Sequence, residues 1–299
     1  MKPKFSLIIA LAPYRNAEVL SSLKKVNYDK KKYEIIIEKG YNPSDNRNKG
    51  VKKAKSEIIY FLDDDAIVDK TILKNAEDFF DKYKDIDIVG GPQLTPKDDK
   101  FFAKMFGAAI ESFWGSYKMA NRYKKGKLNL NADEFSLTSA NCFVKKSIFK
   151  KIAGFDSRIW PGEDPEFFAR AKRNGFKIAY SPDLIIYHRR RPDLLSFLKQ
   201  HYKYGNVRLK KERINKTTTN FVMIIPSLFV IYIILLPILV LIWDLFLLPL
   251  ILYALIALIF SINIAIKKNI IYLPFLPFIF FSMHLSYGIG MLADLFEKK

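Results

Sequence analysis

The stretch Glu57-Ile58-Ile59-Tyr60-Phe61-Leu62-Asp63-Asp64-Asp65 decides the fold of this 299-residue chain. Its first six residues form an apolar run of one strand's length, which is typical of a sheet covered on both faces. Three carboxylates follow directly. Because adjacent carboxylates repel one another, a divalent cation is their simplest counter-charge, and Mg²⁺ and Mn²⁺ prefer oxygen ligands. The alternative is a solvated acidic turn, but the position after an apolar strand favours a metal site.

The segments around this stretch alternate between strand and helix patterns. Strands are predicted at residues 5–11, 33–37 and 86–89, and helices at 17–26, 48–55 and 71–83, the last with Asp69 as its N-cap candidate. This alternation predicts an α/β fold with a mainly parallel, doubly wound sheet. Ligands bind such sheets at the carboxyl ends of the strands, which is where the three carboxylates stand.

The last part of the chain is apolar. Three stretches, at about 221–243, 245–266 and 270–292, are each long enough to cross a bilayer, which takes about 20 residues. A very apolar soluble core is the alternative, and three such lengths in succession disfavour it. We therefore predict a globular domain at residues 1–216, ending in a basic segment, and a region of about three transmembrane helices at 217–299.

The charge distribution predicts how these helices are oriented. The formal net charge is +19, and basic residues gather between His188 and Lys216, just before the first apolar stretch. Such a flank is usually cytoplasmic and faces membrane lipids. Lys267 and Lys268 would share that side and Asp244 would lie outside. Three full crossings would put the C-terminus outside as well, unless the third stretch, which holds prolines and His284, is re-entrant.

A basic chain also raises nucleic acid as a partner. No helix-turn-helix, zinc-finger or aromatic RNA-binding signature accompanies the charge. We therefore expect membrane lipids and no nucleic acid among the partners.

Three further groups of residues suggest chemistry. In Glu163-Asp164, paired carboxylates push one another's pKa apart, so that one can act as a base; the alternative is that Asp164 caps a helix. His188 ends an apolar run and precedes Arg189-Arg190-Arg191, a combination that suits a metal and phosphate, or else a membrane flank. Residues 46–50, Asn-Arg-Asn-Lys-Gly, stand before the second predicted helix, where an anion could bind.

These residues, taken in order over about residues 5–205, resemble the family 2 glycosyltransferases, whose catalytic domain has the GT-A fold. Asp63-Asp64-Asp65 resembles the family's Asp-x-Asp motif, in which the last carboxylate holds the metal and the first faces the nucleoside. Residues 46–50 are similar to its Arg-Asn-x-Gly segment near the diphosphate. Pro13-Tyr14-Arg15-Asn16 looks like the loop that meets the nucleotide.

The later stretch carries the most specific part of the resemblance. Residues 139–146 followed by Gly154-Phe155-Asp156 are similar to the family's small-residue acceptor loop and its Gly-Gly-Phe-Asp segment. Glu163-Asp164 then falls where the family keeps its base, and His188 would complete the metal site.

Two departures from the family pattern bear on the substrates. Glu38-Lys39-Gly40 stands where many members have an Asp that reads the base, which leaves the nucleotide open. Gln200-His201-Tyr202-Lys203-Tyr204 is a degenerate copy of the Gln-x-x-Arg-Trp segment of processive synthases. This departure, with only three apolar stretches, argues against a synthase with its own export channel, although Tyr204 can still stack on a sugar.

The resemblance implies an inverting, metal-dependent glycosyltransferase. It would move a sugar from a nucleotide-diphosphate sugar to a membrane-associated acceptor, a lipid-linked glycan, in cell-surface glycan or glycoconjugate synthesis. Two alternatives stay open: a polyprenyl-phosphate sugar synthase, and a non-catalytic membrane-tethered binding protein on a transferase scaffold. The expected location is the cell membrane of a prokaryote, multi-pass, with the catalytic domain in the cytoplasm.

The resemblance also implies a role for each site residue. Asp164 would be the base with Glu163 beside it, and Asp63, Asp65 and His188 would hold Mn²⁺ or Mg²⁺. Contacts to the nucleotide-sugar are expected from Pro13, Tyr14, Arg15, Glu38, Arg47, Lys49, Asp63 and Asp64. Contacts to the acceptor or its phosphate are expected from Asn141, Arg189, Arg190, Arg191, Gln200 and Tyr204.

Overall fold

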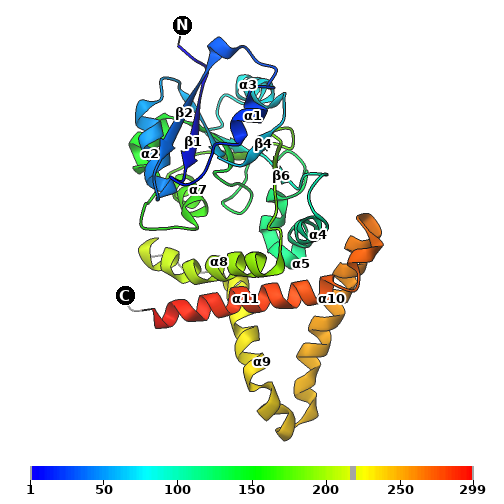
Figure 1. Ribbon diagram of the computed structural model, residues 1–299. Helices are drawn as coiled ribbons and strands as arrows, with labels where there is room; N and C mark the ends of the chain where they lie inside the picture. The colour runs from blue at the N-terminus through cyan, green and yellow to red at the C-terminus, as the bar shows by residue number, and fades with distance from the viewer. Residues whose placement is uncertain (1, 216–219, 298–299) are drawn as a thin grey trace. The chain divides into compact units, whose positions relative to one another are not determined.

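The computed structural model describes residues 2–215 and 220–297 (Figure 1). The chain divides into two compact units. The first comprises Met1–Lys97 and Lys118–Arg189, and the second comprises Asp98–Tyr117 and Arg190–Lys299. Residues 98–117 and 190–215 thus group with the apolar helices in this division, and the predicted boundary at residue 216 stays a prediction.

The first unit is built on a six-stranded sheet in the order β2-β1-β3-β7-β5-β8. Its strands are β1 (Phe5–Leu11), β2 (Tyr33–Lys39), β3 (Ile58–Asp63), β5 (Ile88–Gly90), β7 (Asn141–Lys145) and β8 (Ile178–Tyr180). Only β7 runs against its neighbours β3 and β5, and the other pairs are parallel. The expected α/β fold with a mainly parallel sheet is therefore confirmed.

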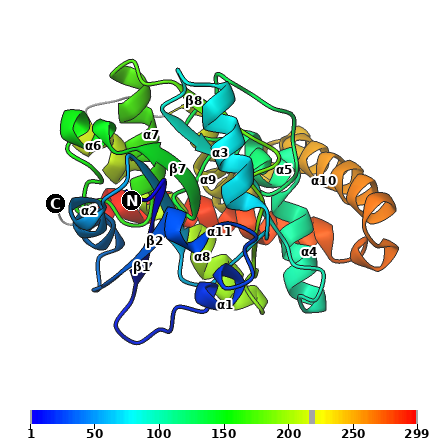
Figure 2. The ribbon, with the colours of Figure 1, turned by 90° about the horizontal axis from the view of Figure 1, so that it is seen from above.

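Helices cover both faces of this sheet (Figure 2). On one face lie α1 (Val19–Leu23) and α3 (Ile72–Lys82); on the other lie α2 (Pro43–Lys53), α6 (Ser147–Ile152) and α7 (Glu163–Arg173). Along β1, Leu7 and Ile9 point into the first core and Ile8 into the second. This period of two, in a strand whose residues are all apolar except Ser6, is what burial on both faces requires.

Two helices differ from the expectation. The first shrinks to the five residues of α1. The second, expected at 48–55, begins at Pro43, because the Asn42 side chain accepts hydrogen bonds from the backbone amides of Ser44 and Asp45 and so caps the helix. Residues 46–50 therefore lie inside α2 rather than before it, so their expected position at a helix N-terminus was wrong, and anion binding by these residues stays a prediction.

Helix α3 is close to the expected 71–83, but its N-cap position is Thr71. The Asp69 carboxylate instead accepts a hydrogen bond of 2.9 Å from the Thr71 backbone amide, in the turn before the helix.

A second, three-stranded sheet joins distant parts of the first unit. It has the order β4-β9-β6, with β4 at Ala66–Val68, β6 at Gln93–Leu94 and β9 at Ile186–His188. Strand β4 runs antiparallel to β9 and pairs Ala66 with His188. That register places His188 beside the acidic triplet, although His188 follows Ala66 by 122 residues in the chain.

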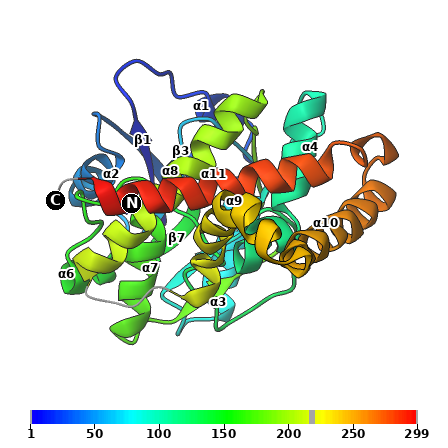
Figure 3. The same cartoon turned by 90° about the horizontal axis from the view of Figure 1, so that it is seen from below.

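The second unit is helical (Figure 3). It holds α4 (Phe101–Ile110), α5 (Phe113–Ser116), α8 (Leu194–Asn215), α9 (Ile225–Ile242), α10 (Leu248–Lys267) and α11 (Leu276–Phe296). Short 3-10 turns lie next to the apolar helices at Phe221–Met223, Asp244–Leu247 and Ile270–Tyr272. Two more lie elsewhere in the chain, at Lys30–Lys32 in the first unit and at Tyr117–Arg122. Helices α9, α10 with its preceding turn, and α11 are long and apolar enough to cross a membrane.

Candidate active site

Asp63, Asp65 and His188 form a group that could hold a metal ion. Each offers one ligand atom, and these atoms lie within 4.8 Å of one another. Nε2 of His188 is 3.1 Å from an oxygen of Asp65 and 3.8 Å from an oxygen of Asp63. Two carboxylates and an imidazole are donors that suit Mn²⁺ or Mg²⁺ with further positions left open. The expected metal ligands are thus brought together by the end of β3 and the end of β9.

The charge balance around this group favours a cation. Burial raises the pKa of Asp63, although the charges of Arg47 and His188 act in the opposite direction. Burial would also raise the pKa of Asp65, but hydrogen bonds and ion pairs with His188 and Arg15 outweigh it and lower that pKa. Asp65 is therefore held as a carboxylate, the form in which it can bind a metal.

Arg47 lies at the centre of the acidic residues. Its side chain is buried, with Nη1 2.7 Å from an oxygen of Glu163 and Nη2 3.2 Å from an oxygen of Asp63. Burial would lower the pKa of Arg47, but the charges of Glu163, Asp63 and Asp164 raise it. Its Nε is buried and has no hydrogen-bond partner in the described part of the chain. The sequence singled out Arg47, but the pairing with Glu163 was missed, because 116 residues separate the two.

Glu163 and Asp164 begin α7 and have different surroundings. Gly162 precedes them with a φ of 113°, a left-handed conformation that glycine adopts at little cost. Burial, together with the nearby charge of Asp164, raises the pKa of the buried Glu163. Asp164 is partly exposed, and one of its oxygens accepts a hydrogen bond of 3.3 Å from the Ser139 backbone amide.

The helix-capping alternative for Asp164 does not apply. The N-cap position of α7 is Gly162, and Asp164 is the second residue of the helix.

Asp64 and Arg15 complete the acidic end of the sheet. Arg15 places Nη1 3.0 Å from an oxygen of Asp64 and Nη2 2.6 Å from an oxygen of Asp65. Burial raises the pKa of Asp64 to about 6, against the opposing charge of Arg15. Arg15 was expected to meet the nucleotide, and the structure adds its ion pairs with the triplet. Its neighbours Pro13 and Tyr14 are exposed, Tyr14 by 82%.

Several motif residues have structural contacts instead of facing this cluster. Asn48 exchanges two hydrogen bonds with the backbone of Phe155, which fastens the loop before α7 to α2. Gly50 packs so closely on Ile8 that a Cβ would lie 2.5 Å from its side chain. Glu38 forms an ion pair of 2.7 Å with Lys53, and Lys49 is exposed on α2. Nucleotide contacts by Glu38 and Lys49 stay predictions.

The assignment of Asn141 to the acceptor needs correction. Its side chain is fully buried. It donates a hydrogen bond of 2.6 Å to the carbonyl of Leu184 and accepts one of 3.0 Å from the Tyr60 hydroxyl. Asn141 therefore joins β7 to β3 and to the segment before β9, and an acceptor cannot reach it.

The remaining acceptor candidates belong to residues 189–204, where the first unit ends and the chain continues in the second. Arg189 ends the first unit, whereas the backbone amide of Arg190 donates to Asp99 at 3.0 Å within the second. Arg191 is exposed, and on α8 Gln200 is partly exposed and Tyr204 is exposed. Contacts from Arg189, Arg190, Arg191, Gln200 and Tyr204 to an acceptor stay predictions.

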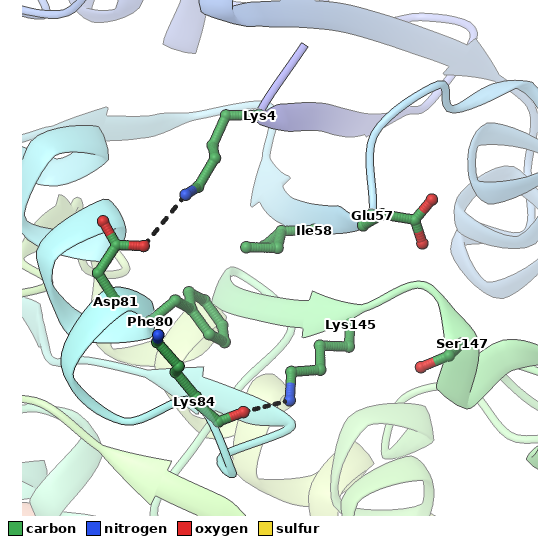
Figure 4. Close-up of a pocket in the computed structure, with 8 residues that line it drawn as sticks. All are labelled: Lys4, Glu57, Ile58, Phe80, Asp81, Lys84, Lys145 and Ser147. Carbon is green, nitrogen blue, oxygen red and sulfur yellow. Dashed lines mark hydrogen bonds and ion pairs between the residues drawn. The ribbon is translucent and has the colours of Figure 1, made fainter. Parts of the chain in front are cut away.

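A shallow pocket of about 370 Å³ lies elsewhere in the first unit (Figure 4). It is lined by Lys4 and Ile58, at the starts of β1 and β3, and by Lys145, at the end of the antiparallel β7. These residues mark the amino edge of the parallel strands, opposite the acidic cluster. Lys4 and Lys145 are moreover bound to Asp81 and to the carbonyl of Lys84. We therefore locate the candidate active site at the acidic cluster.

Curated relatives of known role share part of this chain. It is 28% identical over 181 residues to the minor teichoic acid biosynthesis protein GgaB of Bacillus subtilis, covering 58% of this chain and 17% of that protein. It is 27% identical over 155 residues to the O-antigen chain rhamnosyltransferase RfbN of Salmonella typhimurium, covering 51% of this chain and 48% of that protein. The chain thus spans less than half the length of either relative.

A solved structure shares the fold. The mannosyltransferase PcManGT from Pyrobaculum calidifontis, in complex with GDP-Man and Mn²⁺, superposes with a TM-score of 0.58 at 14% identity. The superposition covers 100% of this chain and 89% of that one. The family model described as glycosyl transferase family group 2 matches residues 58–292. Because that match spans most of the chain and includes the acidic triplet, Glu163-Asp164 and His188, the chain belongs to this glycosyltransferase family and has its GT-A-like α/β fold.

Proposed function

We propose that this enzyme transfers a sugar, with inversion, from a nucleoside-diphosphate sugar to a membrane-associated acceptor. One observation carries the proposal: Asp63, Asp65, His188 and the Glu163-Asp164 pair converge around the buried Arg47. This arrangement combines a cation site, a fixed positive charge and a separate carboxylate. Those are the groups that transfer from a diphosphate leaving group needs.

The residues present fit a divalent cation. Asp63, Asp65 and His188 would hold it, and when bound it would supply positive charge to the diphosphate. Five carboxylates, those of Asp63, Asp64, Asp65, Glu163 and Asp164, gather here, and the ion pairs described for them join four of them to the guanidinium groups of Arg15 and Arg47 and to the imidazole of His188. The excess of negative charge supports a cationic ligand.

Arg47 would favour the departing diphosphate through its positive charge. Its guanidinium is buried beside Asp63 and Glu163, so the charge is fixed at this end of the sheet without needing direct contact with a phosphate oxygen. Glu163 holds the guanidinium in place through an ion pair of 2.7 Å. The side chain is therefore oriented before the donor arrives, and such preorganisation favours the charge that develops on the leaving group.

Asp164 would accept the proton in the displacement. The acceptor oxygen bonds to the anomeric carbon, its proton passes to Asp164, and the bond from that carbon to the diphosphate breaks with its electron pair on the phosphate oxygen. Glu163 is a poorer candidate, because it is buried and paired with Arg47. Asp164 is partly exposed, and the Ser139 amide orients it.

The acceptor would be a lipid-linked glycan at the membrane, and the catalytic unit would lie in the cytoplasm of a prokaryotic cell. The apolar helices α9 and α10 support a membrane location. The names of the two curated relatives, which refer to teichoic acid and O-antigen chains, support a cell-surface glycan as the product. Transfer to a polyprenyl phosphate itself would give a lipid monophosphate sugar instead of an extended glycan, so product analysis separates the two.

A donor screen tests the proposal. In Mn²⁺, one nucleotide-sugar should raise the melting temperature of the full chain in detergent by mass action, and it should be the sugar transferred to lipid-linked acceptor. EDTA should abolish transfer, and Mn²⁺ or Mg²⁺ should restore it. Asp65→Asn should lose Mn²⁺ binding measured by electron paramagnetic resonance, whereas the surface control Asp85→Asn should keep it. Full transfer in chelator would remove the metal from the proposal.

A further inference from the structure

Helix α11 differs from the other two apolar helices of the second unit. In the most apolar window of α11, 39% of the residues are buried, against 11% for both α9 and α10. A helix surrounded by lipid leaves most of its side chains uncovered by protein, as α9 and α10 do. The protein that covers α11 is mainly α8, and the two helices lie one on the other in both side and bottom views (Figures 1 and 3).

Glycines allow α8 and α11 to approach closely. A Cβ at Gly205 of α8 would collide with the carbonyl of Tyr287, and one at Gly290 of α11 would collide with the carbonyl of Tyr202. Close backbone contact through small residues is typical of tightly packed helix pairs. The crossing is thus specific to this pair of helices.

Polar side chains fasten the C-terminal half of α11 to α8. The Ser286 hydroxyl donates to the carbonyl of Leu198 at 2.7 Å. Arg213 of α8 binds both oxygens of Asp294 at 2.7 Å, and Asp294 is only 3% exposed. Beyond the helix end, Asn206 of α8 donates to Glu297 at 2.7 Å. Residues 286–297 are therefore tied to α8 along their length.

Helix α8 cannot lie in the hydrocarbon core of a bilayer. It carries six Lys or Arg residues and one Glu, namely Lys199, Lys203, Arg208, Lys210, Lys211, Arg213 and Glu212. Each Lys or Arg at the bilayer centre costs about 2.5–3.5 kcal/mol even on the mildest scale. Helix α8 therefore lies in water or among lipid headgroups, and the part of α11 that is fastened to it must lie at the same depth.

The rest of α11 is too short to cross. Between Leu276 and Leu285 there are ten residues, about 15 Å of helix, against a hydrocarbon thickness of about 30 Å. The segment between α10 and α11 also begins in polar surroundings, because Lys268 forms an ion pair of 2.6 Å with Glu111. In contrast, α9 and α10 have 18 and 20 residues, which suffice to cross with the help of their flanking turns.

We infer that α11 is an interfacial helix and that the chain crosses the membrane twice, through α9 and α10. Two crossings return the chain at Lys267 to the side of α8, where α11 then lies at the boundary between headgroups and hydrocarbon. Its partner on the uncovered face is the lipid surface, which its exposed Phe278, Ile289 and Leu295 would enter. The C-terminus is then on the side of α8 and not, as three crossings would require, on the side of Asp244.

Cysteine labelling of the full chain tests this topology. The only native cysteine, Cys142, is fully buried, so the unsubstituted chain serves as the background control. Three single additions report on three places: Lys30→Cys on the first unit, Asp244→Cys at the tip between α9 and α10, and a cysteine appended after Lys299. Spheroplasts would be treated with a membrane-impermeant maleimide before and after lysis.

In intact spheroplasts only Asp244→Cys should react, and after lysis Lys30→Cys and the appended cysteine should react as well. The inference would be overturned if the appended cysteine reacted together with Asp244→Cys before lysis, since that requires a third crossing. It would also be overturned if Asp244→Cys behaved as Lys30→Cys does, since then α9 and α10 do not cross. The result does not depend on the proposed transferase activity.

Discussion

Two arginine–carboxylate pairs, one in each unit, have opposite surroundings. Arg47 and Glu163 are 6% and 7% exposed and lie among further carboxylates, so the negative charge around them exceeds the positive. Arg213 and Asp294 are 41% and 2% exposed and bind each other through two hydrogen bonds of 2.7 Å. The second pair is balanced and fastens two helices. Around the first pair, negative charge exceeds positive charge. Such an excess of buried negative charge is expected where a protein binds a cation.

The largest effect is expected from Arg47→Met, which keeps the bulk of the side chain but removes its charge. Glu163 would then be a buried carboxylate without its partner, at a cost of about 3–5 kcal/mol in the free energy of unfolding. Chemical denaturation of the full chain in detergent measures it. The exposed Lys52→Met on the same helix is the control and should change stability little.

The double variant Arg47→Met with Glu163→Gln should recover part of this loss, because it removes the unpaired charge. A change below about 1 kcal/mol in Arg47→Met alone would contradict the burial of charge in this cluster.

Next in size is the effect of Asp164→Asn on turnover. Loss of general-base catalysis should lower kcat by at least about 10²-fold, while the dissociation constant of the nucleotide-sugar stays nearly unchanged. Steady-state transfer and donor titration measure the two quantities separately. Asp156→Asn, a change of the same kind near the preceding loop, should leave kcat closer to normal. Near-normal turnover in Asp164→Asn would exclude this residue as the base.

In the balanced pair, Arg213→Met should cost less, about 1–3 kcal/mol, because Asp294 loses its partner but Arg213 was partly hydrated already. Arg213→Met with Asp294→Leu should restore stability, since no charge is then left in the contact. Thermal unfolding in detergent compares both with Lys210→Met, an exposed change on the same helix. If the double variant is as unstable as the single one, the loss of stability does not come from the unpaired charge of Asp294.

The smallest effect concerns His201, a buried imidazole of α8 whose Nδ1 donates a hydrogen bond of 2.9 Å to the carbonyl of Phe197. Burial lowers its pKa from 6.5 to about 4. Above pH 6.5 the ring is neutral in folded and unfolded chains alike. Between pH 6.5 and about 4 only the unfolded chain binds the proton, so stability falls as the pH falls, by up to about 1.4 kcal/mol per pH unit.

Unfolding of the chain and of His201→Gln, followed from pH 7.5 to 5, should show this loss as a difference in slope. Equal slopes would mean that His201 is hydrated or charged in the folded protein.

Much of the first unit was predictable, because its signals are local. The apolar run before Asp63 and the alternation with helices predicted a mainly parallel sheet, and β1 has the predicted bounds of Phe5–Leu11. The start of α2 was predicted too late, because the cap at Asn42 is a single polar side chain ahead of a weakly apolar helix. Asn141 was assigned to the acceptor because of its place in a motif. A motif does not say which way the side-chain amide points, so the burial of Asn141 could not be predicted.

The sequence alone determined that this chain has an α/β glycosyltransferase domain and helices long enough to cross a membrane. The α/β pattern and the helix lengths depend on the period and length of apolar runs, which each segment carries by itself, and the family was indicated by the resemblance of short motifs taken in order. Only the tertiary structure decided that Glu163 holds Arg47 while Asp164 stays partly exposed, and that α11 is fastened to the charged helix α8. Both facts depend on which charges meet across 116 and 81 residues of chain, and such pairing is a property of the fold and not of any window of sequence.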